Sequence, residues 1–260
     1  IQAAFGVGML LGAGGASLSI GAGWSLTLNY LVVAAVVAVV SVLASLQFPL
    51  RDKPVAKPRG EERKLSFSVW REKRTLLIAV IGFSFIMAEM SAGTWVPIAL
   101  TVSGFSGSAA AFVFGIFWIV ITLGRLAGGF VVEAIGRYRT VLLSTIVTAA
   151  GILIFMLVEV VALPYLGLVL WGLGMAMGIP MSVASMSDDP AKAPYRINMV
   201  ITIVYISSIS VGPLLGSVGE IAGIYVAFSI PLALMIVSAI LSPATKHLEM
   251  PSGKSEQQPG

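Results

Sequence analysis

The chain has 260 residues, of which 57% are hydrophobic and only 11% are charged. Soluble domains are nearer to about 45–50% apolar and about 25% charged, so this composition excludes an ordinary water-soluble globule. The sequence contains no cysteine, which excludes disulfides, thiolate metal sites and cysteine nucleophiles. Because the chain opens at Ile1 inside an apolar run, we expect a fragment or a processed chain without a cleavable signal peptide.

Eight apolar runs are long enough to cross a membrane, which requires about 20 residues for each crossing. Turn-forming glycine, serine, aspartate and proline residues separate several of them. We therefore predict an all-α polytopic membrane protein with eight transmembrane helices. The runs cover roughly residues 2–21, 25–48, 75–98, 108–131, 140–158, 163–185, 197–217 and 222–242.

The positions of the 16 lysines and arginines predict the orientation of these spans. Nine lie between the second and third runs, and the others lie at or near the connector of the fourth and fifth runs, after the sixth run and in the tail. All of them fall on one side of an eight-span topology. By the positive-inside rule that side is cytoplasmic, and we expect both chain ends to lie there.

Two segments outside the runs have a polar composition. Residues 49–74 are predicted to form a basic cytoplasmic linker, in which four acidic residues dilute the positive charge and argue against nucleic-acid binding. Its end, around Leu65–Trp70, is expected to form a short interfacial element. Residues 243–260 are predicted to form a disordered cytoplasmic tail.

A short internal echo relates the first and seventh runs. Residues 6–12 and 210–216 agree at five of seven positions, with an offset of 204 residues. If the echo reflects a repeat, the chain derives from two parallel halves of about 200 residues, as in transporters built from repeats. About four helices would then precede the present first residue.

The segment Gly124–Arg139 resembles the cytoplasmic signature of the major facilitator superfamily (MFS) of secondary transporters. The matching positions are Gly129, Glu133, Gly136, Arg137 and Arg139, whereas Ala134 and Tyr138 stand where basic residues are usual. The block Ser187–Pro190, the pair Gly212–Pro213 downstream, and Ala88–Glu89 followed by Trp95 also resemble a bacterial subgroup.

The resemblance implies helices five to twelve of a twelve-helix fold in a bacterial inner membrane. Residues 1–48 would be the last two helices of the N-terminal half, and residues 75–242 the six helices of the C-terminal half. The missing first four helices of the same protein would then be a partner of this chain. A solute would bind near mid-membrane between the halves and be transported by alternating access.

Glu89 is the only acidic residue in the middle of a predicted span. An ionised carboxylate in the bilayer core is costly, so it should be protonated, paired or facing water. We interpret it as a site of proton or cation coupling, or of substrate binding; a structural carboxyl bonded to Ser91, Thr94 or a neighbouring helix is the alternative. Trp95, Tyr205 and Asn198 are predicted to join it in binding substrate or protons, because a polar stripe on the seventh run (Asn198, Thr202, Tyr205 and Ser208) suggests a cavity-lining helix.

A second group of residues is predicted to form a gate at the cytoplasmic end. Arg125 lies about six residues from the predicted inner edge, where its side chain could reach the interface. Glu133 would cap the positive N-terminal end of the first span when the gate is closed. Arg137 and Arg139 would pair with Asp188 or Asp189, although a helix cap at Asp189–Pro190 with solvated bases explains these residues equally well. The resemblance adds Gly129 and Gly136 to this group.

Glycine pairs four residues apart are predicted to permit close helix crossings rather than to bind phosphate. They are Gly8/Gly12, Gly124/Gly128, Gly174/Gly178 and Gly212/Gly216.

The remaining function classes are less consistent with the residues. Gly104–Gly107 matches a tetrapeptide of intramembrane serine proteases, but the single histidine, His247, lies in the tail and cannot serve as the base, so we predict that the protein is not an enzyme. We expect no metal and no cofactor. We therefore predict a secondary transporter of a small solute, with proton coupling as one mechanism. A truncated, inactive transporter fragment and a non-transporting membrane scaffold or sensor remain the alternatives.

Overall fold

A computed structural model of the chain describes residues 21–47, 60–157 and 163–247, together with scattered positions before residue 20. Within these residues, seven helices are long and apolar enough to cross a membrane. They correspond to the second to eighth predicted spans; most of the first predicted span lies outside the described residues. The helices are α2 (Leu26–Gln47), α4 (Lys73–Val102), α5 (Gly107–Ile135), α6 (Arg137–Met156), α7 (Leu163–Ala184), α8 (Ala193–Ala222) and a last span formed by α9 (Ile224–Ala227), α10 (Ser229–Leu241) and the short 3-10 helix η2 (Ser242–Thr245).

Three of these helices are longer than the apolar runs that predicted them. Helices α4 and α8 have 30 residues each and α5 has 29, because helical hydrogen bonding continues into the polar residues that flank each run. At 1.5 Å per residue, 30 residues span about 45 Å, which exceeds a hydrocarbon core of about 30 Å. The ends of these helices therefore extend to the membrane surfaces, where their charged residues lie.

The end of the basic linker, where a short interfacial element is predicted around Leu65–Trp70, is helical. Helix α3 (Gly60–Ser68) continues into the 3-10 helix η1 (Val69–Arg71), and the chain then enters α4. The side chain of Val69 is fully buried against a small cluster formed by α4 and α8, whereas Phe67 and Trp70 are exposed. One residue thus fixes this element to the bundle while its other apolar side chains remain available to a membrane surface.

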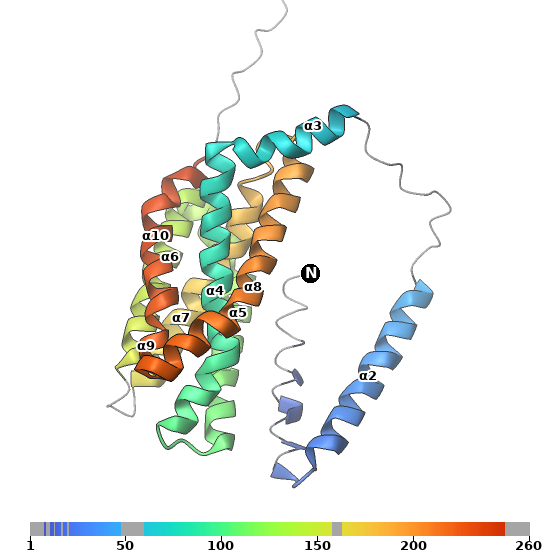
Figure 1. Ribbon diagram of the computed structural model, residues 1–260, viewed down its shortest axis with the longest axis vertical. Helices are drawn as coiled ribbons and strands as arrows, with labels where there is room; N and C mark the ends of the chain where they lie inside the picture. The colour runs from blue at the N-terminus through green and yellow to red at the C-terminus, as the bar shows by residue number, and fades with distance from the viewer. Residues whose placement is uncertain are drawn as a thin grey trace, which may run out of the picture.

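Helices α4 to α10 form a bundle in which α6 and α7 lie side by side, and α4 packs against α8, α10 and α7 (Figure 1). The start of α4, the start of α8 and the end of α10 lie together at the end of the bundle that carries α3. Helix α2 stands apart from this bundle, and its apolar side chains are exposed along the whole helix. Its exposed side chains are mostly Val, Ala and Leu, which are suited to contact with lipid.

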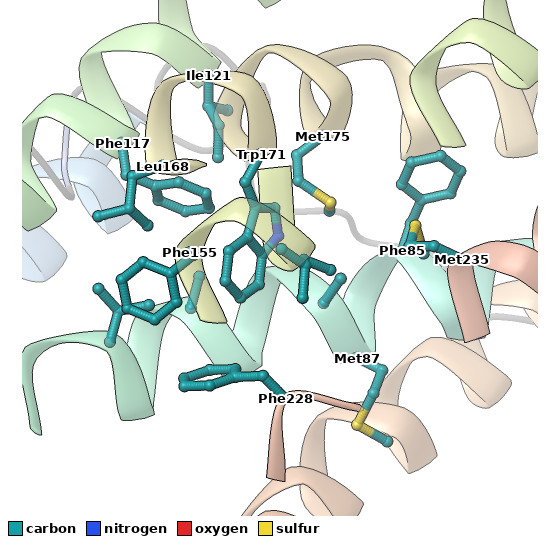
Figure 2. Packing of buried hydrophobic residues seen from close by; sticks show 14 of the residues in the cluster. Phe85, Met87, Phe117, Ile121, Phe155, Leu168, Trp171, Met175, Phe228 and Met235 are labelled. Carbon is teal, nitrogen blue, oxygen red and sulfur yellow. The ribbon is translucent and has the colours of Figure 1, made fainter. Parts of the chain in front are cut away.

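Aromatic side chains from four helices fill the core of the bundle around Trp171 (Figure 2). The ring centroid of Trp171 lies 5.9 Å from that of Phe117, 6.0 Å from that of Phe155 and 5.7 Å from that of Phe228. Each pair of rings has an edge-to-face arrangement. Such geometry places positive ring edges against negative ring faces. Helices α5, α6, α7 and the last span are thereby joined through one side chain.

Small residues permit the closest helix crossings, as predicted for two of the four glycine pairs. A Cβ atom at Gly124 would lie 2.6 Å from the Cβ of Ala176, and one at Gly174 would collide with the backbone of α6 at Thr148. Among the described residues no close crossing forms at Gly8, Gly12 or Gly212, because a Cβ atom at these positions would meet nothing within 4 Å. Those glycines lie on faces that the described residues leave uncovered.

Candidate functional site

Glu89 and Arg125 form an ion pair between the middle of α4 and the inner half of α5. The Nη2 atom of Arg125 lies 3.1 Å from each carboxylate oxygen of Glu89. Glu89 is 16 residues from the start of α4, which is about 24 Å along the helix, and 13 residues from its end. Arg125 is ten residues, or about 15 Å, from the end of α5. The predicted mid-span carboxylate is therefore paired rather than exposed to lipid.

The direction of side chains on helices explains how residues at different depths meet. The Cα–Cβ bonds of a helix tilt toward its N-terminus. Helix α4 starts at the cytoplasmic end of the predicted topology and α5 starts at the opposite end, so Glu89 leans inward and Arg125 leans outward. The two side chains converge. The sequence placed Arg125 nearer to the end of its span than the structure does, because α5 extends four residues beyond the predicted span. The guanidinium group of Arg125 bonds to Glu89 instead of extending to the predicted inner interface.

Burial makes this pair energetically important. The side chains of Arg125 and Glu89 are only 7% and 4% exposed. Desolvation of two charges opposes their attraction in such an environment, but removal of one partner leaves a buried, uncompensated charge. The Nε atom of Arg125 is also buried and has no hydrogen-bond partner among the described residues. The hydroxyl of Ser91, considered as a partner of Glu89, instead donates to the carbonyl of Met87.

Neither of the two pockets identified in the described residues is lined by Glu89 or Arg125. In this conformation the side chain of Glu89, paired between α4 and α5, is only 4% exposed. Access of a proton or a solute to Glu89 therefore requires that these two helices separate locally or that the cavity is completed by other parts of the protein.

At the end of the bundle that is predicted to be cytoplasmic, Asp188 joins four parts of the structure. Its two carboxylate oxygens accept hydrogen bonds from Arg74 at 2.7 Å and from Arg137 at 2.8 Å. Arg137 also donates to the carbonyl of Ala184 at the end of α7. Arg74 donates to the carbonyls of Ser185, Ala244 and Lys246. The start of α4, the start of α6, the end of α7 and the segment after α10 are thus joined.

A second carboxylate, Glu72, joins α4 to α8. Its oxygens accept hydrogen bonds from the Nζ of Lys192 and the Nε of Arg196, both at 2.7 Å, and from the hydroxyl of Thr75. Glu72 lies immediately before the first turn of α4, and Lys192 lies immediately before that of α8. A negative charge near the N-terminus of a helix stabilises the helix, because this end of the helix dipole is positive. The two basic residues at the start of α8 would by themselves destabilise that helix. Glu72 therefore stabilises both helix starts.

The basic partners lower the pKa values of both carboxyl groups. Burial raises the pKa of Glu72, but the hydrogen bonds from Arg196, Lys192 and Thr75 outweigh burial and lower it from 4.5 to about 2. Burial likewise raises the pKa of Asp188, and the hydrogen bonds and charges of Arg137 and Arg74 hold it below its usual range. Both groups are therefore carboxylates at neutral pH.

The structure brings together some of the predicted gate residues and separates others. Arg137 pairs with Asp188, but Arg139 is exposed, and Asp189 accepts a hydrogen bond from the backbone N–H of Ala191 in a local turn. Glu133 is exposed at the end of α5, and its predicted partner, the start of the first span, lies outside the described residues.

Two glycines of the signature differ in their local structure. Gly136 separates α5 from α6 with a φ of 77° and a ψ of 162°, a conformation that is essentially restricted to glycine. Gly129 lies inside α5, and a Cβ atom there would meet nothing within 4 Å. Only the first of these positions requires glycine for its backbone conformation.

The predicted substrate residues do not surround Glu89. Trp95 lines a separate pocket of about 460 Å³ near the outer end of α4, together with Gly212, Gly216 and Glu220 of α8. Asn198 and Tyr205 lie on an exposed face of α8, where the side chain of Tyr205 is 66% exposed. Several hydroxyl groups of this polar stripe bond to the backbone of their own helix. Among the described residues the stripe faces outward rather than into an enclosed cavity.

The sequence alone assigns no site role to Glu72, Arg74 or Arg196, which it presents only as charges of the linker and of the segment after the sixth run. Their positions carried a signal, because each lies within one turn of a helix start, where ends of neighbouring helices converge. Among the described residues, no group of three His, Asp or Glu side chains could hold a metal ion.

The fold and the buried charge pair show which class of protein this chain represents. It is a polytopic helical membrane protein with a polar site inside its helix bundle. The sequence profile of the Major Facilitator Superfamily matches residues 1–213. The chain therefore belongs to this superfamily, as its signature suggested, and the proteins to which it is similar are described as transporters.

Individual relatives agree with this assignment. The chain is 26% identical over 245 residues to an uncharacterised MFS-type transporter of Yersinia pestis, covering 93% of this chain and 62% of that protein. Its fold is similar to that of the MFS transporter FucP in the outward conformation, with a TM-score of 0.65 and 17% identity, over 86% of this chain and 55% of FucP. A structure of the E. coli fucose:proton symporter FucP matches with a TM-score of 0.63 and 16% identity, over 84% of this chain and 55% of FucP. The chain thus spans between half and two thirds of the length of these proteins.

Proposed function

We propose that the protein to which this chain belongs is a secondary active transporter that moves a small solute across the bacterial inner membrane by alternating access. Membership of the superfamily supports transport in general. The observation that carries the mechanism is the buried ion pair of Glu89 and Arg125 in the middle of the bundle. Residues 1–48 would complete the N-terminal half together with four further helices, and residues 75–242 would form the C-terminal half.

The ion pair offers a mechanism for proton coupling. While Glu89 is ionised, Arg125 holds α5 against α4 through the two 3.1 Å contacts. Protonation of Glu89 would remove the charge that Arg125 neutralises, so the attraction between the helices would weaken. Helix α5 could then move relative to α4 and change access to the site. Loading and release of the proton on opposite sides would couple this movement to a proton gradient.

The cytoplasmic contacts would form the inner gate of this transporter. Arg137 and Asp188 hold the ends of α6 and α7 together in the present conformation. Glu133 and Arg139 remain exposed beside them and are available to the other half of the protein. We place both chain ends on this cytoplasmic side, in accordance with the distribution of basic residues.

The test is solute-induced proton movement in liposomes that contain the full-length protein. A pH-sensitive dye in the lumen would report proton entry as solutes are added, beginning with fucose because FucP is described as a fucose:proton symporter. Counterflow of the same labelled solute, which needs no proton gradient, would be measured in parallel. The variant Glu89→Gln keeps the size of the side chain but cannot ionise.

The proposal expects Glu89→Gln to lose solute-induced proton movement while it retains part of the counterflow. The matched control is Ser91→Ala on the same helix, since that hydroxyl bonds to the backbone of its own helix. Proton movement of wild-type size in Glu89→Gln would exclude Glu89 as the coupling group. Absence of counterflow for every solute tested, by the wild-type protein, would favour a non-transporting role.

A further inference from the structure

A pocket lies at the end of the bundle that is predicted to be cytoplasmic, beside the gate residues proposed above, and the transport mechanism assigns no ligand to it. Its volume is about 520 Å³. The last turn of α5, the first turn of α6, the end of α7 and the segment after α10 line it. The pocket therefore lies at the level where α5 leaves the membrane and α6 enters it again.

Basic side chains from two distant segments converge on this pocket. Arg137 and Arg139 come from the start of α6, whereas Lys246 and His247 come from the segment after α10, more than 100 residues later. Arg137 is already engaged by Asp188 and Ala184. Arg139 and Lys246 are both exposed, so their charges are available to a ligand.

Lys246 is held at the pocket rather than projecting freely into water. Its Nζ atom lies 5.1 Å above the ring of Tyr138 in α6, a cation–π arrangement. Its carbonyl accepts a 2.9 Å hydrogen bond from Arg74. Arg74 therefore anchors the backbone of Lys246, and the ring of Tyr138 attracts its ammonium group to the start of α6.

The N-terminus of α6 adds a further feature that attracts anions. Gly136 precedes this 20-residue helix and has no side chain, and no side chain caps the helix among the described residues. The first N–H groups of a helix lack partners within the helix, and its dipole makes this end positive. Helix N-termini of this kind bind phosphate groups. Arg137, Tyr138 and Arg139, which line the pocket, form this first turn.

Acidic residues near the pocket do not cancel this positive charge. Asp188 is neutralised by Arg74 and Arg137, and it also lies 4.0 Å from the Nε2 of His247. Glu133 is exposed on the last turn of α5 and does not line the pocket. Among the charged residues that line the pocket, all are basic.

We infer that this pocket binds the anionic phosphate group of a phospholipid headgroup, held by Arg139, Lys246 and the N-terminus of α6. The opposite wall is apolar, formed by Val132, Ile135 and Met181. Such a wall beside the membrane boundary suits the first carbons of an acyl chain. Basic pockets between helices on the cytoplasmic side are suited to anionic lipids. A soluble phosphate compound shares the headgroup chemistry but cannot use the apolar wall.

The test measures lipid binding by the purified, delipidated protein with native mass spectrometry. Phosphatidylglycerol and phosphatidylcholine with identical acyl chains are titrated separately. The double variant Arg139→Gln/Lys246→Gln should weaken phosphatidylglycerol binding roughly 25-fold, because each of the two basic residues near an anionic lipid contributes about a fivefold effect. The control Arg71→Gln/Lys73→Gln removes the same charges from exposed positions of the same membrane face and should leave the binding unchanged.

The outcomes separate specific binding from general surface charge and identify the source of the phosphate. Preference for phosphatidylglycerol that is lost only in the Arg139/Lys246 variant supports the site. Displacement of the lipid by millimolar glycerol phosphate would show that a soluble phosphate suffices, whereas retention of the lipid would show that the acyl chain is needed. Equal binding of the two lipids, or equal losses in the two double variants, would overturn the proposal.

Discussion

Arg125 and Glu89 approach each other from helices that run in opposite directions, with one guanidinium nitrogen 3.1 Å from both carboxylate oxygens. The pair connects α4 to α5 at a depth where neither charge can reach water by itself. Each residue is therefore tolerated in the bundle because the other is present. This interdependence can be measured separately from transport.

A double-mutant cycle should show that the two residues are coupled in stability. Arg125→Met leaves Glu89 buried without a partner and should lower stability by about 3–5 kcal/mol, and Glu89→Met should have a similar effect. The double variant replaces both charges by apolar side chains and should lose less than either single variant. Thermal unfolding of the purified protein in detergent provides the measurement. Additive losses in the double variant would show that the ion pair does not hold the helices together.

The two signature glycines should respond differently to alanine. Gly136→Ala forces a side chain into a backbone conformation with a φ of 77° and should cost about 1–3 kcal/mol. Gly129→Ala places a methyl group in open space inside α5, where alanine is the better helix former by about 1 kcal/mol, and should not destabilise the protein.

Unfolding midpoints of these two variants, compared in the same detergent, test the assignment. Equal destabilisation would contradict it, since the glycine at 129 would then be required for packing that the described residues do not provide.

The span pattern could be predicted from the sequence because a continuous apolar run is a strong one-dimensional signal. The partner of Glu89 could not, because Arg125 lies 36 residues away and the pairing depends on the rotation and tilt of two helices. Arg125 was placed too near the interface for a related reason. Hydropathy gives the apolar centre of a helix, whereas its ends are set by hydrogen bonding that continues through polar residues.

The cytoplasmic ion pairs were predictable only in part. The resemblance to a signature directed attention to Arg137 and Asp188, which do pair. Glu72 and Arg74 lie in a stretch whose mixed charges are typical of a solvated linker, and their sequence neighbours do not show that α8 and the segment after α10 lie opposite them. Their burial follows from tertiary packing alone.

The contribution of Glu72 should depend on pH in a defined direction. Its pKa is lowered from 4.5 to about 2 in the folded protein, so the folded state favours the ionised form. A group of this kind contributes its full stability above the unfolded value of 4.5 and loses it as the pH falls toward 2. Glu72→Gln should therefore be less stable than the wild type at pH 7, and the difference should shrink below about pH 4.5.

Thermal unfolding of the wild type and Glu72→Gln between pH 3 and pH 8, in the same detergent, measures this difference directly. Asp188 is present in both proteins, so its own titration cancels in the comparison. Glu220→Gln serves as the control, because this exposed carboxylate lies at the opposite end of the bundle and its removal should change stability little at any pH. A difference between wild type and Glu72→Gln that stayed constant down to pH 3 would show that the contacts with Lys192 and Arg196 do not stabilise the start of α8 through charge.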